Sequence, residues 1–262
     1  MSELTRREVV KLAAAAAGVA AAGVAGGQPP KLPLDPPPPP PEAVRVADPL
    51  GAMLADGKAA MAKVRDYTCT FTRQERIDGV LGAEQVAEMK ARTQPAAATV
   101  KFVKPEVAFG LEMTYATNKR DGKIRYRPGG IKGTPVVVSD DDAKLLAANR
   151  HPVTQLGIAA TLDLLGSIAA REKALGNGVE TFTSEYKFDG AAVTRYEVFT
   201  RRPHAHRYAH KVLVYVDKET KLPVRFEAYD QPKSGSATGD LLEAYSYSNV
   251  KYNVGLGDAA FE

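Results

Sequence analysis

The feature that most constrains this fold is a succession of short runs in which apolar and polar residues alternate. Such runs include residues 67–71 and 222–229, and Asp-Gly pairs at 78–79, 121–122 and 189–190 separate several of them. Alternation with a period of two predicts strands that bury one face and leave the other wet. Asp-Gly pairs between such strands predict tight hairpin turns. The sequence therefore predicts an antiparallel meander.

The period changes to about 3.6 residues in three segments, which predicts helices. The first helix is expected to start at Asp48 and Pro49, a capping residue followed by a residue suited to the first helical position. The other two are expected between Asp140 and Leu175. Each helix must bury its apolar stripe, and the sheet is the partner that this chain supplies.

The predicted fold class is α+β, with a strongly curved antiparallel sheet that forms a half-open β-barrel. About ten strands are expected, and a sheet of that size curls rather than stays flat. The helices are predicted to pack on or in its concave face. Apolar residues that we expect to line a ligand cavity there are Leu54, Met61, Tyr67, Phe71, Met89, Phe102, Met113, Leu162, Leu165 and Phe226.

The N-terminal region predicts export. In residues 1–27, two consecutive arginines precede an apolar stretch rich in Ala and Gly, a pattern typical of twin-arginine (Tat) signal peptides. Its glycines leave fewer than the roughly 20 strongly apolar residues that a membrane-spanning helix needs. Residues 28–47 hold a run of six prolines and predict an extended linker. We expect a single domain over 48–262 and a periplasmic location.

Composition excludes several classes of protein. Cys69 is the single cysteine of the chain, so an intramolecular disulfide is excluded, and we expect a buried structural thiol. The formal net charge is +4, but the basic residues are scattered, so the sequence does not favour a nucleic-acid partner. This mild charge is compatible with peripheral contact with anionic membrane lipids. The sequence holds no glycine-rich phosphate loop, and we predict no cofactor.

Two histidine-containing segments are candidates for chemistry. On an extended segment His204, His206 and His210 would share a face and could bind a metal ion. Three arginines surround them and no carboxylate or thiol is near, which favours a solvated connection. Between the predicted helices, His151 follows Asn149 and Arg150 without a nucleophile or carboxylate beside it. The pattern favours a role in capping helix ends, and no catalytic residues are predicted.

Several segments carry a resemblance to known families. They are residues 67–71 with Glu75 and Gly79, 100–102, 149–154 with Gly157, 217–224 and 247–253. Over about residues 50–262 the chain resembles the DUF1571 family of planctomycete bacteria. Its layout is similar to the periplasmic lipoprotein-carrier superfamily of LolA, LolB and RseB.

The resemblance implies a protein that binds without catalysing a reaction. In that superfamily a concave sheet capped by helices accepts acyl chains or a hydrophobic segment of a partner, so a lipid or a lipidated protein is the implied ligand. Acyl chains need dry apolar area, at about 0.8 kcal/mol for each buried methylene, and leave no polar motif. One alternative is a structural module whose barrel is plugged by helices and which docks an envelope protein. A metal-binding protein that uses His204, His206 and His210 is a second alternative.

Overall fold

The computed structural model describes residues 48–129, 133–176, 178–200, 207–233 and 238–262. The predicted signal peptide and proline-rich linker lie outside these residues, as do His204 and His206 of the histidine segment. The predicted extent of the signal, linker and domain therefore stays a prediction.

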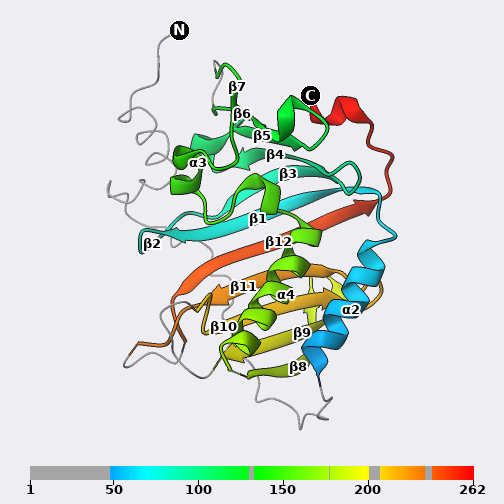
Figure 1. Ribbon diagram of the computed structural model, residues 1–262, viewed down its shortest axis with the longest axis vertical. Coiled ribbons are helices and arrows are strands. Elements are labelled where there is room, and N and C mark those ends of the chain that lie inside the picture. Colours follow the sequence, from blue (N-terminus) through cyan, green and yellow to red (C-terminus); the bar gives the residue numbers. More distant parts are fainter. Residues whose placement is uncertain (1–47, 130–132, 177, 201–206, 234–237) are drawn as a thin grey trace.

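The described residues form one twelve-stranded antiparallel sheet (Figure 1). Its strand order is β7-β6-β5-β4-β3-β1-β12-β11-β10-β9-β8, and the short β2 pairs with β1 alone. The strands are β1 (Asp66–Ile77), β2 (Val80–Leu81), β3 (Gln85–Arg92), β4 (Ala97–Lys104), β5 (Glu112–Ala116), β6 (Ile124–Arg127), β7 (Val136–Val138), β8 (Val179–Phe188), β9 (Ala191–Thr200), β10 (Lys211–Asp217), β11 (Pro223–Tyr229) and β12 (Leu241–Tyr252).

The first and last long strands lie side by side in the middle of the sheet. Phe71 of β1 pairs with Tyr247 of β12, and a meander extends outward from each of the two strands. The sheet does not close, because β7 and β8 are its two ends and are not paired with each other. It is the curved, open sheet that the alternating runs predicted.

Between β7 and β8 the chain passes from one edge of the sheet to the other. Residues 139–178, which we call the crossover segment, carry the helices α3 (Ala143–Ala148) and α4 (Ile158–Ala174). In Figure 1 the segment runs across one face of the sheet, which we call the inner face. This path follows from the topology, since a chain that joins two opposite edges must cross a face.

Helix α2 (Pro49–Met61) lies beside α4. Asp48 caps it by accepting a hydrogen bond from the Gly51 N–H at 2.8 Å, as the sequence predicted. A Cβ atom at Gly57 would lie 2.7 Å from the side chain of Leu162 on α4, so glycine allows the two helices to approach closely. The three predicted helices are confirmed, and helices cover the concave face.

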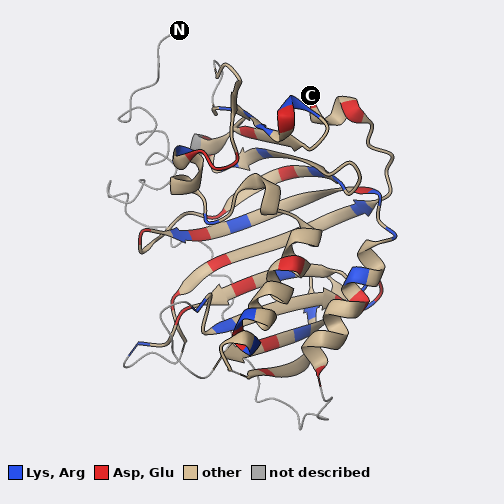
Figure 2. Ribbon diagram, viewed as in Figure 1, with Lys and Arg blue, Asp and Glu red and all other residues tan. Residues whose placement is uncertain are grey.

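Two strands were not expected from the sequence. Strand β7 consists of three consecutive valines, Val136–Val138, which show no alternation. Strand β2 has two residues, which is too short for a periodic pattern. Acidic and basic residues are interspersed along the strands of the described chain (Figure 2).

Candidate functional site

The apolar part of the inner face is built around stacked aromatic rings of the central strands. The ring centroids of Phe71 and Tyr247 lie 5.5 Å apart, those of Phe71 and Tyr245 lie 5.8 Å apart, and those of Phe226 and Tyr245 lie 6.2 Å apart. Phe71 and Phe226 have no accessible surface. A side chain without accessible surface borders neither solvent nor a void wide enough for water, so this part of the core is filled.

The start of α4 is hydrogen-bonded to two tyrosines of the inner face. The Ile158 N–H donates to the Tyr67 hydroxyl at 3.0 Å, which satisfies one of the free donors at the helix N-terminus. The Thr161 and Tyr247 hydroxyls lie 3.0 Å apart. Gly157 has φ +109°, and a Cβ atom there would lie 2.6 Å from the Tyr67 hydroxyl. The chain therefore needs glycine where the crossover segment enters α4.

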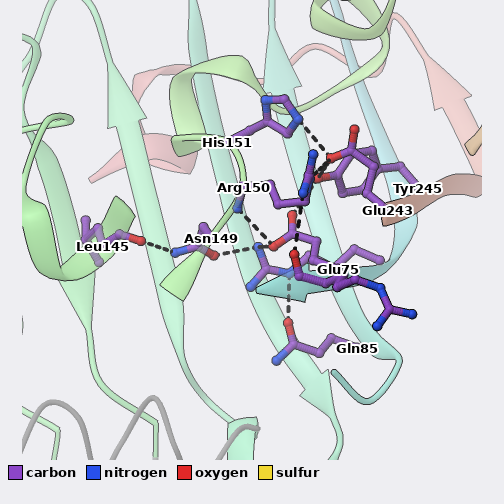
Figure 3. A network of polar contacts seen from close by, with 10 residues as sticks. Glu75, Gln85, Leu145, Asn149, Arg150, His151, Glu243 and Tyr245 are labelled. Carbon is purple, nitrogen blue, oxygen red and sulfur yellow. Dashed lines mark hydrogen bonds and ion pairs between the residues drawn. The ribbon is translucent and has the colours of Figure 1, made fainter. Parts of the chain in front are cut away.

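Beyond these tyrosines the inner face becomes charged. We call Arg73, Glu75, Arg150, His151 and Glu243 the ionic cluster, and Figure 3 labels all of them except Arg73. Strand β1 supplies Arg73 and Glu75, strand β12 supplies Glu243, and the loop between α3 and α4 supplies Arg150 and His151. The cluster thus joins the crossover segment to the two central strands.

Glu243 is the centre of the ionic cluster and has no accessible surface. Its Oε2 atom lies 3.1 Å from the Arg150 Nε and 2.9 Å from the His151 Nε2. The Tyr208 hydroxyl donates to its other oxygen, Oε1. The Tyr245 hydroxyl lies 2.5 Å from Glu75 Oε1 and 3.0 Å from Glu243 Oε2, between the two carboxylates.

Arg73 links the crossover segment to strand β3. Its Nη1 donates to Asn149 Oδ1 at 2.7 Å, and its Nε donates to Gln85 Oε1 at 2.8 Å. The same guanidinium lies 3.7 Å from Glu75 Oε2 and 4.7 Å from the centre of the Phe102 ring. These contacts fix the planar guanidinium on both sides, which is how arginine best uses its donors.

The electrostatics of the ionic cluster act on His151. Burial alone would lower the pKa of His151, but the hydrogen bond that Glu243 accepts from its ring and the negative charge of Glu243 outweigh burial and raise that pKa. Burial and the charges of Glu243 and Glu75 raise the pKa of the Tyr245 hydroxyl. Tyr245 therefore stays protonated and can donate to a carboxylate at neutral pH.

Residues 64–262 match the family described as a protein of unknown function, DUF1571. The chain belongs to the DUF1571 family. The matched residues include the whole sheet, the crossover segment and all five members of the ionic cluster, whereas α2 precedes them. No curated protein is significantly similar to this chain in sequence.

Solved structures similar to this DUF1571 member have low sequence identity to it. An uncharacterized conserved protein from Thermus thermophilus has a TM-score of 0.45 and 11% identity, with 80% of this chain and 91% of that chain covered. The MucA/MucB complex of Pseudomonas aeruginosa has a TM-score of 0.48 and 12% identity, with 81% of this chain and 60% of that chain covered. The lipoprotein LppX of Mycobacterium tuberculosis has a TM-score of 0.44 and 12% identity, with 79% of this chain and 97% of that chain covered.

The sequence misjudged His151. Asn149 does cap α3, because its amide donates to the Leu145 carbonyl at 2.7 Å. His151 pairs instead with a carboxylate that lies 92 positions away in the sequence, so the prediction of a capping role was wrong for this residue. The sequence did contain a signal for this site. Glu75 and Glu243 stand at positions of their strands that are buried, where the alternation predicts apolar residues.

The ten predicted cavity residues all lie in or against the main core. Leu54 is half-buried, and the other nine are buried. None of them lines a recess of about 60 Å³ that lies between α2 and strands β9 and β10. Pockets for small molecules typically measure about 300–1,000 Å³, so this recess is too small for an acyl chain. Their role as a ligand cavity stays a prediction.

The described residues offer little to a metal ion. No group of three or more His, Cys, Asp or Glu side chains is placed to hold a metal within the described ranges. His210 lies 3.2 Å from the Arg207 guanidinium, and burial together with that charge lowers its pKa. Cys69 is buried, as predicted. No helix in the described part of the chain has the length and hydrophobicity to cross a bilayer.

Proposed function

We propose that this protein is a non-catalytic binding module that accepts an acyl chain between the crossover segment and the inner face of the sheet. One observation carries the proposal. A large apolar face is covered by helices. The crossover segment is attached to the central strands by polar contacts near the start of α4, namely the ionic cluster and the hydrogen bonds of Tyr67 and Tyr247. Removing such a cover exposes continuous apolar surface, and acyl chains gain about 0.8 kcal/mol for each methylene buried there.

The ends of α4 suggest how the cover would open. Its C-terminal end is followed by Gly176, with φ +68°, and Gly178, and glycines tolerate the large backbone changes of a hinge. Its N-terminal end is held by the ionic cluster and by Tyr67 and Tyr247. The ionic cluster then acts as a latch and the glycines as a hinge. An opened cover would let a lipid or the acyl group of a lipidated protein lie along the stacked rings.

The ionic cluster favours a positioning role over catalysis. The Nε2 of His151 faces Glu243 and Tyr208, so this ring atom already has partners. No serine, threonine or cysteine side chain of the described residues hydrogen-bonds to His151, and a general base acts on a group within that reach. We infer that the protein is not an enzyme. The twin-arginine pattern of residues 1–27 supports a function outside the cytoplasm. The ligands that we propose for the protein there are lipids and lipidated envelope proteins.

The filled core supports a second candidate. Phe71 and Phe226 have no accessible surface, which also fits a module whose barrel is permanently plugged by α2 and α4 and which binds an envelope protein elsewhere. The two functions differ in one property. A binding module must open and take up a ligand, whereas a plugged module stays closed.

Native mass spectrometry tests the proposal. The chain from residue 48 onward would be incubated with palmitic acid and with a diacylated lipopeptide, and complexes would be counted by mass. We expect a complex of one protein with one ligand for at least one of the two probes. A protein that remains free with both probes, while its inner-face amides stay protected from hydrogen exchange, would support the plugged module instead.

A further inference from the structure

Strand β8 presents a long free edge. It has ten residues, pairs with β9 alone and ends the sheet. The Asp189-Gly190 turn places Phe188 opposite Ala191, and hydrogen-bonded pairs then recur at every second residue. The N–H and C=O groups of the odd-numbered residues therefore point away from β9. Nothing in the described chain accepts or donates a backbone hydrogen bond on that side.

Proteins normally protect such an edge. Short strands, bulges, prolines or inward-pointing charges are the common devices. Strand β8 has no proline, and its pairing with β9 runs without a bulge from Val179 to Phe188. It does carry two charged residues at odd positions, Glu185 and Lys187, and Glu185 is paired with Lys218 of its own chain. An edge of this length that is left regular is a template for another strand.

Two aromatic side chains on β8 are unusually exposed. Phe182 is 39% exposed and Tyr186 is 47% exposed. Each ring contacts a neighbour within the sheet at one side: Phe182 lies edge-on to Phe199, and Tyr186 lies edge-on to Tyr215. Both point to the outer face, and Ser184 lies midway between them. Phe182 and Tyr186 thus lie at equal distances from Ser184 along the strand, whereas Phe188, the third aromatic residue of β8, has Glu180 at the matching position.

We propose that β8 pairs antiparallel with β8 of a second copy of this chain, about a two-fold axis that passes through Ser184. The axis brings Phe182 of each copy opposite Tyr186 of the other, which makes two aromatic cross-strand pairs. The sheets of both copies then continue into one another. The dimer contact lies at the β8 edge of the sheet, whereas the proposed acyl site lies on the inner face. The dimer therefore does not depend on acyl binding.

The hydrogen-bond phase fits this register. The odd-numbered residues donate and accept across the new interface, so Phe182 and Tyr186 fall in non-hydrogen-bonded pairs, where Cα atoms are about 4.5 Å apart and side chains are closest. Ser184 faces itself at the centre. A two-fold axis of this kind also keeps the even-numbered residues of both β8 strands on the same face of the joined sheet, which is the outer face.

The two neighbouring registers fit worse. An axis through Glu185 would place two like charges directly opposite each other, which is destabilising. An axis through Thr183 would place Phe182 opposite Ser184 and lose both aromatic pairs. With the axis at Ser184, Thr183 faces Glu185 and Thr181 faces Lys187, so no like charges meet directly. Glu185 is also neutralised within its own chain by Lys218.

Cysteine crosslinking tests the register, and Ser184→Cys is the decisive variant. Cα atoms about 4.5 Å apart suit a disulfide, so mild oxidation should produce a covalent dimer rapidly. Ser167→Cys, on the exposed face of α4, is the matched control and should crosslink only slowly. Burial raises the pKa of Cys69 to about 12, so the native thiol does not interfere. Equal crosslinking rates for the two variants would overturn the register.

Proline substitution tests the edge itself by light scattering. Thr183→Pro removes an N–H that points outward and is not used in the pairing with β9, so the fold should persist and the dimer should become a monomer. Thr183→Val keeps the N–H and should remain a dimer. A parent protein that is monomeric at every concentration, or a dimer that survives Thr183→Pro with an unchanged circular dichroism spectrum, would overturn the proposal.

Discussion

Two regions of the inner face hold the crossover segment by different physical means. On β1, Phe71 faces the helices with an apolar ring, whereas Glu75, four residues further along the same face, binds the loop that leads to α4. On β12, Tyr247 stacks its ring on Phe71 and contacts the Thr161 hydroxyl, whereas Glu243 pairs with Arg150. Apolar burial is non-directional and tolerates sliding or replacement by another apolar group. Charged hydrogen bonds hold one geometry, so the ionic cluster defines the closed position.

The largest expected loss of stability comes from a substitution in the apolar region. Phe71→Ala removes a ring that has no accessible surface, and we expect a loss of about 3–5 kcal/mol in the free energy of unfolding. Urea unfolding followed by circular dichroism measures it. Val137→Ala, at an exposed site on β7, is the control and should change stability by less than about 0.5 kcal/mol. Equal losses for the two variants would contradict the assignment of the core.

The second prediction breaks the ionic cluster. Glu243→Gln keeps the shape of the side chain and removes the charge that faces Arg150 and His151. Because Arg150 is partly exposed and can be solvated, we expect a loss of about 2 kcal/mol, below the range for a fully buried pair. Urea unfolding is again the measurement. Glu112→Gln, which breaks a pair with Arg125 on the outer face, should cost less than half as much.

A smaller effect is expected where the crossover segment enters α3. The Asp142 carboxylate accepts hydrogen bonds from the N–H groups of Lys144 and Leu145 at 2.9 and 3.2 Å. Asp142→Ala should lower stability by about 1 kcal/mol. Asp142→Asn, which retains an acceptor at the cap, should recover most of this loss in the same unfolding experiment. A loss that persists in Asp142→Asn would indicate that charge rather than capping matters.

The smallest effect sharpens the role of His151 through pH. Its folded pKa lies above the ordinary value, so protonated His151 stabilises the fold at pH values below about 6.5, and this contribution is lost as pH rises through the folded pKa. The difference in unfolding free energy between the parent and His151→Gln should therefore be larger at about pH 6 than at about pH 8. A difference that grows with pH would contradict the pairing with Glu243.

Much of the fold could be predicted from local patterns. Asp48 and Pro49 mark the start of α2, and the alternation around Phe71 indicates which face of β1 is buried. Strand β7 was not predicted, because its three consecutive valines show no alternation, although it pairs with the preceding strand β6. Local sequence therefore determined elements better than it determined the edges of the sheet.

The ionic cluster could not be assembled from sequence for a related reason. Glu75, His151 and Glu243 come from three segments separated by 76 and 92 positions, and only the pairing of β1 with β12 brings the two glutamates together. Alternation marks each glutamate as a charged residue at a buried position. It does not reveal which cation neutralises it, because that partner comes from a loop.

The central claim is that the ionic cluster keeps a binding-competent inner face closed, and fluorescence titration with 11-(dansylamino)undecanoic acid tests it directly. When the open state is a minor population, apparent affinity scales with that population. Weakening the latch by about 2 kcal/mol should then tighten binding by up to about 30-fold in Glu243→Gln relative to the parent, whereas Glu112→Gln should bind as the parent does. An affinity that is unchanged or weaker in Glu243→Gln would contradict the account.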